Sequence, residues 1–156
     1  MEIEMGNNPN ERLVEHLLLY YAWDDIELDS ELMTTFWSNS APELRSYAIR
    51  FIGKAGKGVS ANLTDRLKQL WETRLNVIFK AEDKDPFIEE LKAFGWIFVS
   101  KTFDDEWVLN QLEKVLQLIS VIDDDHGVVK RLALLSGKNP RKVVKLIERL
   151  VLSDRK

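Results

Sequence analysis

All four prolines of the chain fall in the first turn of a predicted helix, and none interrupts a periodic apolar segment. Pro9, Pro86 and Pro140 each follow Asn or Asp, and Pro42 lies two residues after Ser40. Proline is tolerated in a first turn, where its missing N–H would have no partner, but breaks a helix interior. No segment shows the period-two alternation of a half-buried strand. The sequence therefore predicts an all-α fold.

Between the prolines, apolar residues recur at the three- and four-residue spacing of amphipathic helices. We expect eight helices, which run from residue 9 to 23–25, 29–30 to 38, 40 to 53–58, 60 to 80, 85 to 100–102, 104 to 123–125, 126 to 135, and 139 onward. Residues 1–8 are interpreted as an acidic tail and residues 9–156 as a single α-helical domain. Short connections favour antiparallel helical hairpins.

The segment 85–112 is the most aromatic part of the chain, and its first helix is apolar almost all round. Its six aromatic residues are Phe87, Phe94, Trp96, Phe98, Phe103 and Trp107. A helix of this kind is typical of the centre of a core. Gly95, which has no Cβ, is predicted to let a neighbouring helix approach closely. Trp96 falls off the main apolar arc and is a candidate for contact with a partner.

Helix-capping patterns support several of these boundaries. Ser40 and Glu43 have the spacing of a capping box, Asp104 is the predicted N-cap of the sixth helix, and Asp125 that of the seventh. Gly53 is assigned to a helix end. The last helix is expected to bury one apolar face, formed by Val143, Val144, Ile147, Leu150 and Val151.

Composition excludes several classes of protein. The chain has no cysteine, so disulfide scaffolds, thiolate zinc sites and cysteine nucleophiles are excluded. The acidic N-terminus lacks the apolar region of a secretory signal, and the longest apolar runs, 17–23 and 93–99, are too short to span a bilayer. We expect a cytoplasmic protein that does not enter membranes.

Two segments resemble functional motifs but fail in detail. The glycine-rich segment 53–60 departs from the GxxxxGK[ST] pattern of a phosphate loop, because Val59 follows Gly58 and a helix precedes it. Asp123–His126 places metal-ligand types in a row, but adjacent residues of a loop point in different directions, so a solvated loop is the better interpretation. No hydrolase or metalloprotease motif occurs, and no carboxylate is predicted to have an apolar setting. We therefore expect no enzymatic activity, cofactor or metal.

Charge is distributed unevenly along the chain. Residues 126–156 carry nine basic and two acidic groups, whereas residues 1–125 carry 13 basic and 24 acidic ones. Four basic residues of the last helix share about one quadrant of the helical wheel, and others precede them. The predicted interaction surface consists of Lys130, Arg131, Lys138, Arg141, Lys142, Lys145 and Arg149, together with Trp96. A protein partner is the preferred interpretation, and nucleic acid bound by the basic C-terminal helix is the alternative.

One stretch resembles a known repeat family. Ser40-Ala-Pro-Glu-Leu-Arg-Ser-Tyr-Ala, continuing to Phe51 and Gly53, is similar to the first helix of a HEAT repeat, with its proline, arginine, alanine and glycine. The resemblance implies an αα-superhelix whose stacked helix pairs present a curved surface to a partner. The central FGWIFVSKTFDDEW stretch looks similar to C-terminal helical regions of long, poorly characterised bacterial proteins. Because the proline spacing is irregular, an irregular helical bundle is the alternative.

Together these patterns favour a non-enzymatic helical interaction or scaffold module. It would bind a protein partner through the basic C-terminal residues. The sequence leaves the oligomeric state open.

Overall fold

In the computed structural model, residues 9–23, 30–55 and 61–153 are described, and they form helices and no strands. The elements are α1 (Pro9–Trp23), α2 (Ser30–Asn39), α3 (Pro42–Ala55), α4 (Ala61–Lys80), a 3₁₀ turn (Asp85–Phe87), α5 (Ile88–Val99), α6 (Asp105–Leu118), α7 (Asp125–Leu135) and α8 (Pro140–Ser153). The all-α prediction with eight helices is confirmed for the described residues. The predicted acidic tail and the glycines at 56 and 58 lie outside them.

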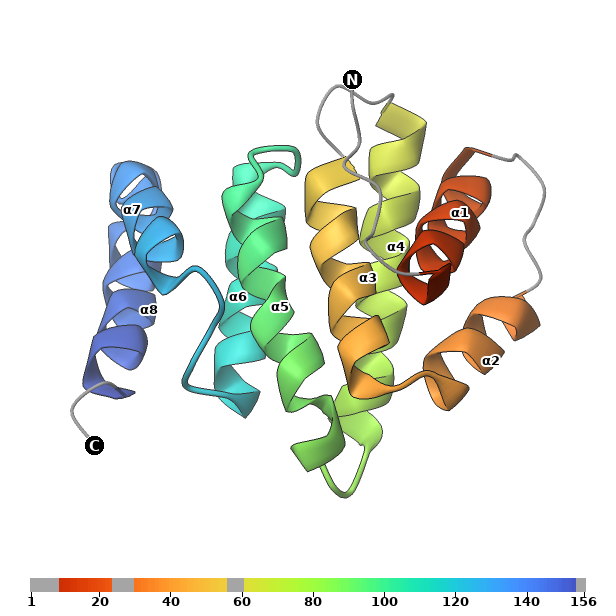
Figure 1. Ribbon diagram of the computed structural model, residues 1–156. Helices are drawn as coiled ribbons and strands as arrows, with labels where there is room; N and C mark the ends of the chain where they lie inside the picture. The colour runs from red at the N-terminus through yellow and green to blue at the C-terminus, as the bar shows by residue number, and fades with distance from the viewer. Residues whose placement is uncertain (1–8, 24–29, 56–60, 154–156) are drawn as a thin grey trace.

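Helix α5 lies at the centre of the molecule. It packs against α3 on one side and α7 on the other, and it also contacts α6 (Figure 1). Helix α8 packs against α6 and α7, while α1 packs against α3 and α4. In Figure 1, α4, α6 and α8 stand behind α3, α5 and α7, so these helices form two rows, while α1 and α2 lie beside α3 and α4. The last helix pair closes one end of these rows.

Two buried glycines allow other backbone segments to approach α5 closely. A Cβ on Gly53 would lie 2.7 Å from the carbonyl oxygen of Trp96, so this glycine brings α3 against α5. A Cβ on Gly95 would lie 1.9 Å from the carbonyl oxygen of Asp123, which belongs to the α6–α7 connection. The predicted close approach at Gly95 is therefore made by a loop, not a helix. Gly53 lies inside α3, where it serves helix packing, and does not end the helix as predicted.

The sixth helix is shorter than its apolar pattern predicted. It ends at Leu118, and Ile119 is already extended, with φ −135° and ψ 160°. Val121 and Ile122 are β-branched residues, which fit extended backbone well. Ile122 is buried, so its side chain joins the core from a loop. The backbone N–H of Asp123 donates to the carbonyl oxygen of Lys92 at 3.0 Å, which fastens the connection to α5.

The capping predictions had mixed outcomes. The Asp104 N-cap is confirmed, because its Oδ1 accepts a hydrogen bond from the N–H of Trp107 at 2.9 Å. The N-cap of α7 is Asp124, not Asp125; Asp124 has φ 50°, a left-handed conformation that a short polar side chain tolerates. The Ser40 prediction was wrong as well. Helix α3 begins at Pro42, so Ser40 lies two residues before it.

The aromatic residues around α5 pack in the core, as predicted. Phe94, Phe98 and Phe103 are buried, and the rings of Trp71 and Phe94 stack with centroids 4.7 Å apart. The ring of Trp107 lies 5.0 Å from that of Phe103. Such aromatic pairs contribute packing energy beyond their buried area. Within the described part of the chain, every helix is too short or too polar to cross a membrane.

Candidate functional site

The predicted basic surface is formed mainly by α7, α8 and the turn that joins them. Its exposed members are Lys130, Lys138, Arg141, Lys145 and Arg149. No carboxylate of the described residues forms an ion pair with Arg141, Lys145 or Arg149. These three cations, all on α8, are therefore available for contact with another molecule. We call Arg141, Lys145 and Arg149 the α8 basic cluster.

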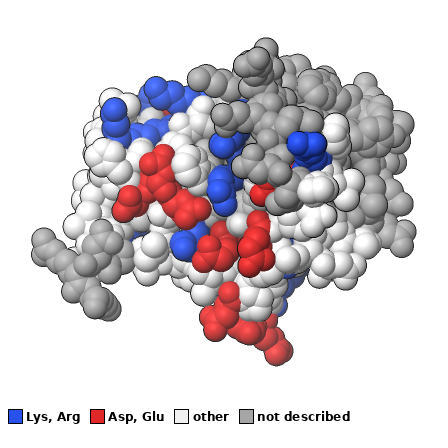
Figure 2. All heavy atoms as spheres, in the orientation of Figure 1, with Lys and Arg blue, Asp and Glu red and all other residues white. Residues whose placement is uncertain are grey.

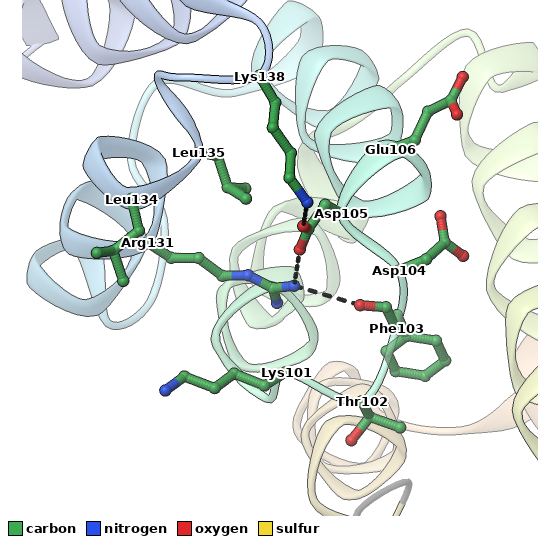
Figure 3. A pocket seen from close by; sticks show the side chains of 10 residues that line it. All are labelled: Lys101, Thr102, Phe103, Asp104, Asp105, Glu106, Arg131, Leu134, Leu135 and Lys138. Atoms are coloured by element: carbon green, nitrogen blue, oxygen red, sulfur yellow. Dashed lines mark hydrogen bonds and ion pairs between the residues drawn. The ribbon is translucent and has the colours of Figure 1, made fainter.

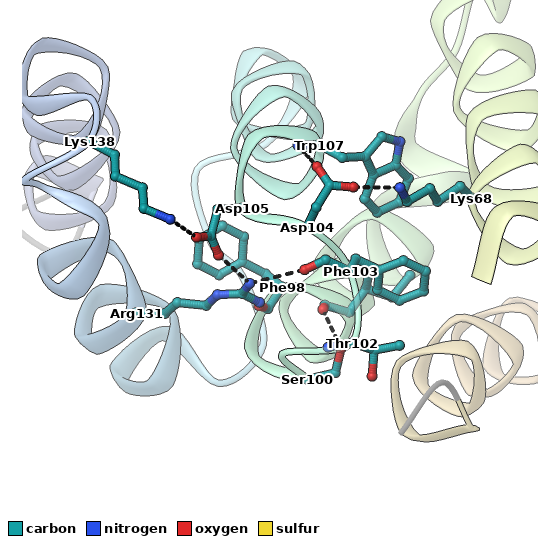
Figure 4. A network of polar contacts seen from close by, with 11 residues as sticks. Lys68, Phe98, Ser100, Thr102, Phe103, Asp104, Asp105, Trp107, Arg131 and Lys138 are labelled. Atoms are coloured by element: carbon teal, nitrogen blue, oxygen red, sulfur yellow. Dashed lines mark hydrogen bonds and ion pairs between the residues drawn. The ribbon is translucent and has the colours of Figure 1, made fainter. Parts of the chain in front are cut away.

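Arg131 of α7 does not belong to the exposed surface. Its side chain is only 9% exposed, and its guanidinium donates hydrogen bonds to the carbonyl oxygens of Phe98 and Phe103 (Figure 4). It also lies 3.1 Å from Asp105 Oδ1. The guanidinium sits over the Phe98 ring, 5.3 Å from its centroid. Arg131 thus satisfies the backbone of the α5–α6 turn from within the molecule.

Lys138 also uses its charge internally, although its side chain is exposed. Its Nζ lies 2.7 Å from Asp105 Oδ2. The hydrogen bonds from Lys138 and Arg131 hold the pKa of Asp105 below its ordinary value. The ion pair fastens the turn after α7 to the first turn of α6.

An open cavity of about 840 Å³ surrounds this ion pair, between the α5–α6 turn and the end of α7 (Figure 3). Its lining includes the cations Lys101, Arg131 and Lys138 and the anions Asp104, Asp105 and Glu106. Because the charges balance, the cavity does not favour a ligand of one sign. Leu134 adds an apolar edge and is 71% exposed.

Lys142 connects α8 to α6. Its Nζ lies 2.8 Å from Glu113 Oε2, and it also donates to Asn110 Oδ1. The hydrogen bond from Lys142 lowers the pKa of Glu113 despite partial burial, and the charges of Arg149 and Lys145 lower it further. Lys142 therefore contributes to packing within the chain and is a poor probe of binding.

Helix α8 buries only part of the predicted face, and Ile147 of that face is partly buried against the core. Val143, Leu146 and Leu150 are buried, whereas Val144 is 53% exposed and Val151 is 43% exposed. The apolar arc of α8 is wider than the surface that α6 and α7 can cover, and contact with them selects the side nearer Leu146. Two predicted core valines are consequently left on the surface beside the α8 basic cluster.

Trp96, the remaining predicted contact residue, is partly buried. It lies on α5, and the cavity beside Asp105 does not include it. Its backbone carbonyl carbon and oxygen pack against Gly53 of α3. The structure thus separates Trp96 from the basic residues with which it was grouped.

A buried ionic cluster at the centre was missed by the sequence analysis. Glu90 of α5 is 1% exposed, and it accepts hydrogen bonds from Arg45 Nε at 3.0 Å and from Arg74 Nη2 at 3.1 Å. Arg45 also donates to the carbonyl oxygens of Ser40 and Pro86, at 2.7 and 2.8 Å. The sequence analysis did not predict that a carboxylate would be buried, although the setting of Glu90 is ionic and not apolar, because two guanidinium groups surround it. The sequence signal was Glu90 itself, a carboxylate in the first turn of a helix that is apolar almost all round.

This cluster links three helices in the interior of the molecule. Its carboxylate has two arginine partners, and the side chains of Arg45 and Arg74 are 8% and 6% exposed. The ring of Phe87 covers both guanidinium groups, at 5.6 Å from Arg45 Cζ and 5.2 Å from Arg74 Cζ. A paired and covered carboxylate holds α3, α4 and α5 together.

The chain matches no protein-family model, and no curated protein or solved structure shows significant similarity to it. The candidate surface is thus defined by its own geometry.

Proposed function

We propose that the chain is a non-enzymatic helical scaffold module that binds an acidic surface of a protein partner through the exposed side of α8. One observation carries the proposal. The exposed Arg141, Lys145 and Arg149 have no ion-pair partner among the described carboxylates, and they share α8 with the exposed Val144 and Val151. Protein interfaces combine apolar contact with charges that select and orient the partner.

The architecture proposed for the module is a HEAT-like αα-superhelix, with an irregular bundle of the same helices as the alternative. Two residues of the HEAT-like stretch support it. Arg45 joins the buried cluster around Glu90, and Gly53 brings α3 against α5. Stacked helix pairs of this kind present extended surfaces to partners. We place the module in the cytoplasm, which the lack of cysteine fits.

The partner is proposed to be protein because of what surrounds the basic cluster. Valines lie on the same helix, and two further predicted cations, Arg131 and Lys142, are used inside the chain. Because these two cations are not free on the surface, the continuous positive surface that phosphate binding needs is smaller than predicted.

The test compares two charge-reversed variants. Arg141→Glu/Lys145→Glu reverses two charges of the α8 basic cluster, and Lys54→Glu/Lys80→Glu makes the same change in charge at exposed residues of α3 and α4. Proteins captured from a nuclease-treated lysate by the wild-type chain are purified and titrated against each variant. We expect the α8 variant to bind at least about tenfold more weakly and the control to bind within about twofold of wild type.

Equal binding by the α8 variant and the wild type would contradict the proposal. Nucleic acid is tested in parallel by fluorescence anisotropy with duplex and single-stranded DNA. Binding that weakens steeply with salt and is lost in the α8 variant alone would replace the protein partner with nucleic acid.

A further inference from the structure

A second open groove, of about 470 Å³, lies between the start of α5 and the connection that follows α6. Its apolar lining consists of Ile88, Leu116, Leu118, Ile119 and Val121, and Lys92 is its one charged lining residue. Ile88 is 37% exposed and Val121 is 54% exposed. The groove exists because α6 ends at Leu118 and the chain continues in an extended conformation. It therefore places apolar side chains on the surface in a concave setting.

Exposed carboxylates lie on the segments that flank this groove. Figure 2 shows acidic side chains near the start of α5, over the α6–α7 connection, and at the lower edge where α4 leads into α5. The exposed acidic residues of these segments are Glu82, Asp83, Asp85, Glu89, Asp124 and Asp125. Lys92 is offset by Glu89, whose Oε1 lies 3.3 Å from the lysine Nζ. The groove thus combines an apolar floor with an acidic rim.

Helix α8 of the same chain has the complementary surface. Val144 and Val151 are exposed two turns apart, a separation of about 10 Å along the helix. Arg141 and Lys145 lie beside Val144 on the exposed side of the helix, and the exposed Glu148 lies between the two valines. An apolar stripe with basic neighbours is the chemistry that an apolar groove with acidic neighbours would select.

We propose that this groove is the docking site for α8 of a second copy of the chain. The inference rests on the proposed function of α8 and names its partner. Val144 and Val151 contact the apolar lining, while Arg141 and Lys145 face the acidic rim. The two surfaces are different, so two arrangements are compatible with the contact. Two copies can exchange their α8 helices reciprocally about a two-fold axis, or copies can associate head to tail into a ring or an open chain.

The experiment is sedimentation velocity of the full chain over about a hundredfold range of concentration at low and high salt. Two variants reverse the two sides of the contact. One is Arg141→Glu/Lys145→Glu on α8, and the other is Glu82→Lys/Glu89→Lys on the rim. All four residues are exposed or have only an exposed ion pair, and circular dichroism checks the fold of each variant.

We expect the wild type to sediment faster as its concentration rises, and salt to reduce this effect. Each variant alone associates at least about tenfold more weakly than the wild type, because like charges then face each other across the contact. An equimolar mixture of the two variants regains association, because the unaltered α8 of the rim variant meets the unaltered rim of the α8 variant, and the acidic α8 meets the basic rim. A third variant, Val121→Asn, places a neutral polar side chain on the apolar floor and weakens association without altering either charged surface.

A wild-type chain that stays monomeric at every concentration overturns this inference, as does a mixture that fails to associate when the wild type does. The proposed function is tested separately. If self-association is absent but a captured acidic protein still loses affinity for Arg141→Glu/Lys145→Glu, α8 binds a different partner. If neither self-association nor capture depends on these residues, both proposals are wrong.

Discussion

The centre of the molecule and its α8 end use the same kinds of charged residue in opposite ways. At the centre, Glu90 is 1% exposed and is held by Arg45 and Arg74. At the α8 end, Glu113 is 44% exposed and is held by Lys142 alone. A buried charge is stable only when it is fully paired. An exposed charge is solvated and needs no partner, so nearby cations can stay unpaired and available for contact with another molecule. We therefore expect stability to depend on the charges of the centre, and the proposed binding to depend on those of α8.

The largest effect is expected at the central cluster. Glu90→Gln removes the negative charge but keeps the shape, leaving two buried guanidinium groups without a counter-ion. Loss of one partner of a buried ion pair costs about 3–5 kcal/mol of unfolding free energy. Urea unfolding monitored by circular dichroism measures this loss.

The matched control is Glu89→Gln, one residue away in the same turn. Glu89 is exposed and pairs with Lys92, so its substitution should change the unfolding free energy by at most about 0.5 kcal/mol. Similar losses in both variants would show that the buried cluster does not stabilise the centre.

The second-largest loss of unfolding free energy is expected at Gly95, where the α6–α7 connection contacts α5. Gly95→Ala introduces a Cβ that overlaps the carbonyl oxygen of Asp123, and the α6–α7 connection must move. Overpacking of this kind costs about 1–3 kcal/mol, to be measured by thermal or urea unfolding. Gly137→Ala is the control, because a Cβ added there would meet no neighbouring atom within 4 Å. A loss at Gly137 as large as that at Gly95 would contradict the proposed cause.

A smaller effect is expected for the link between α6 and α8. Lys142→Gln removes the pair with Glu113, and a partly exposed ion pair contributes roughly 0.2–1 kcal/mol. The loss of unfolding free energy should shrink in high salt, because salt screens exposed charges. A loss of several kcal/mol would contradict this prediction, because it would make the Lys142–Glu113 pair as strong as the buried pairs of Glu90.

The smallest effect is a dependence on pH. Hydrogen bonds from lysine and arginine lower the pKa of Asp105 and Glu113 from their ordinary values of 3.8 and 4.5. A carboxyl group with a lowered pKa in the folded state stabilises the fold above its unfolded pKa, and this contribution disappears as pH falls through the folded pKa. The stability difference between wild type and Asp105→Asn/Glu113→Gln should therefore narrow below about pH 4. A difference that widens on acidification would contradict this assignment.

Local signals in the sequence predicted the helices well. Proline positions and apolar spacing depend on neighbouring residues only, and they located the start of α1 at Pro9, the start of α8 at Pro140 and the Asp104 cap of α6. They failed where distant segments decide the outcome. The apolar pattern of α6 continues through Ile119 and Ile122, but contact with Gly95 and Lys92 holds that segment extended.

The candidate surface was predicted only in part, for the same reason. A helical wheel places Arg141, Lys145 and Arg149 together, and the structure leaves all three exposed. A helical wheel cannot show that Arg131 donates hydrogen bonds to the α5–α6 turn or that Lys142 pairs with Glu113, because those partners lie far away in the sequence. The buried role of Glu90 likewise depends on Arg45 and Arg74 from two other helices.

The separation of stability from binding is tested most directly by measuring two variants in two assays. Arg141→Glu/Lys145→Glu and Glu90→Gln are compared by urea unfolding and by sedimentation velocity. The account predicts that the α8 variant keeps its unfolding free energy within about 0.5 kcal/mol and loses self-association, whereas Glu90→Gln loses about 3–5 kcal/mol. An α8 variant that unfolds as easily as Glu90→Gln, or that self-associates like the wild type, would contradict it.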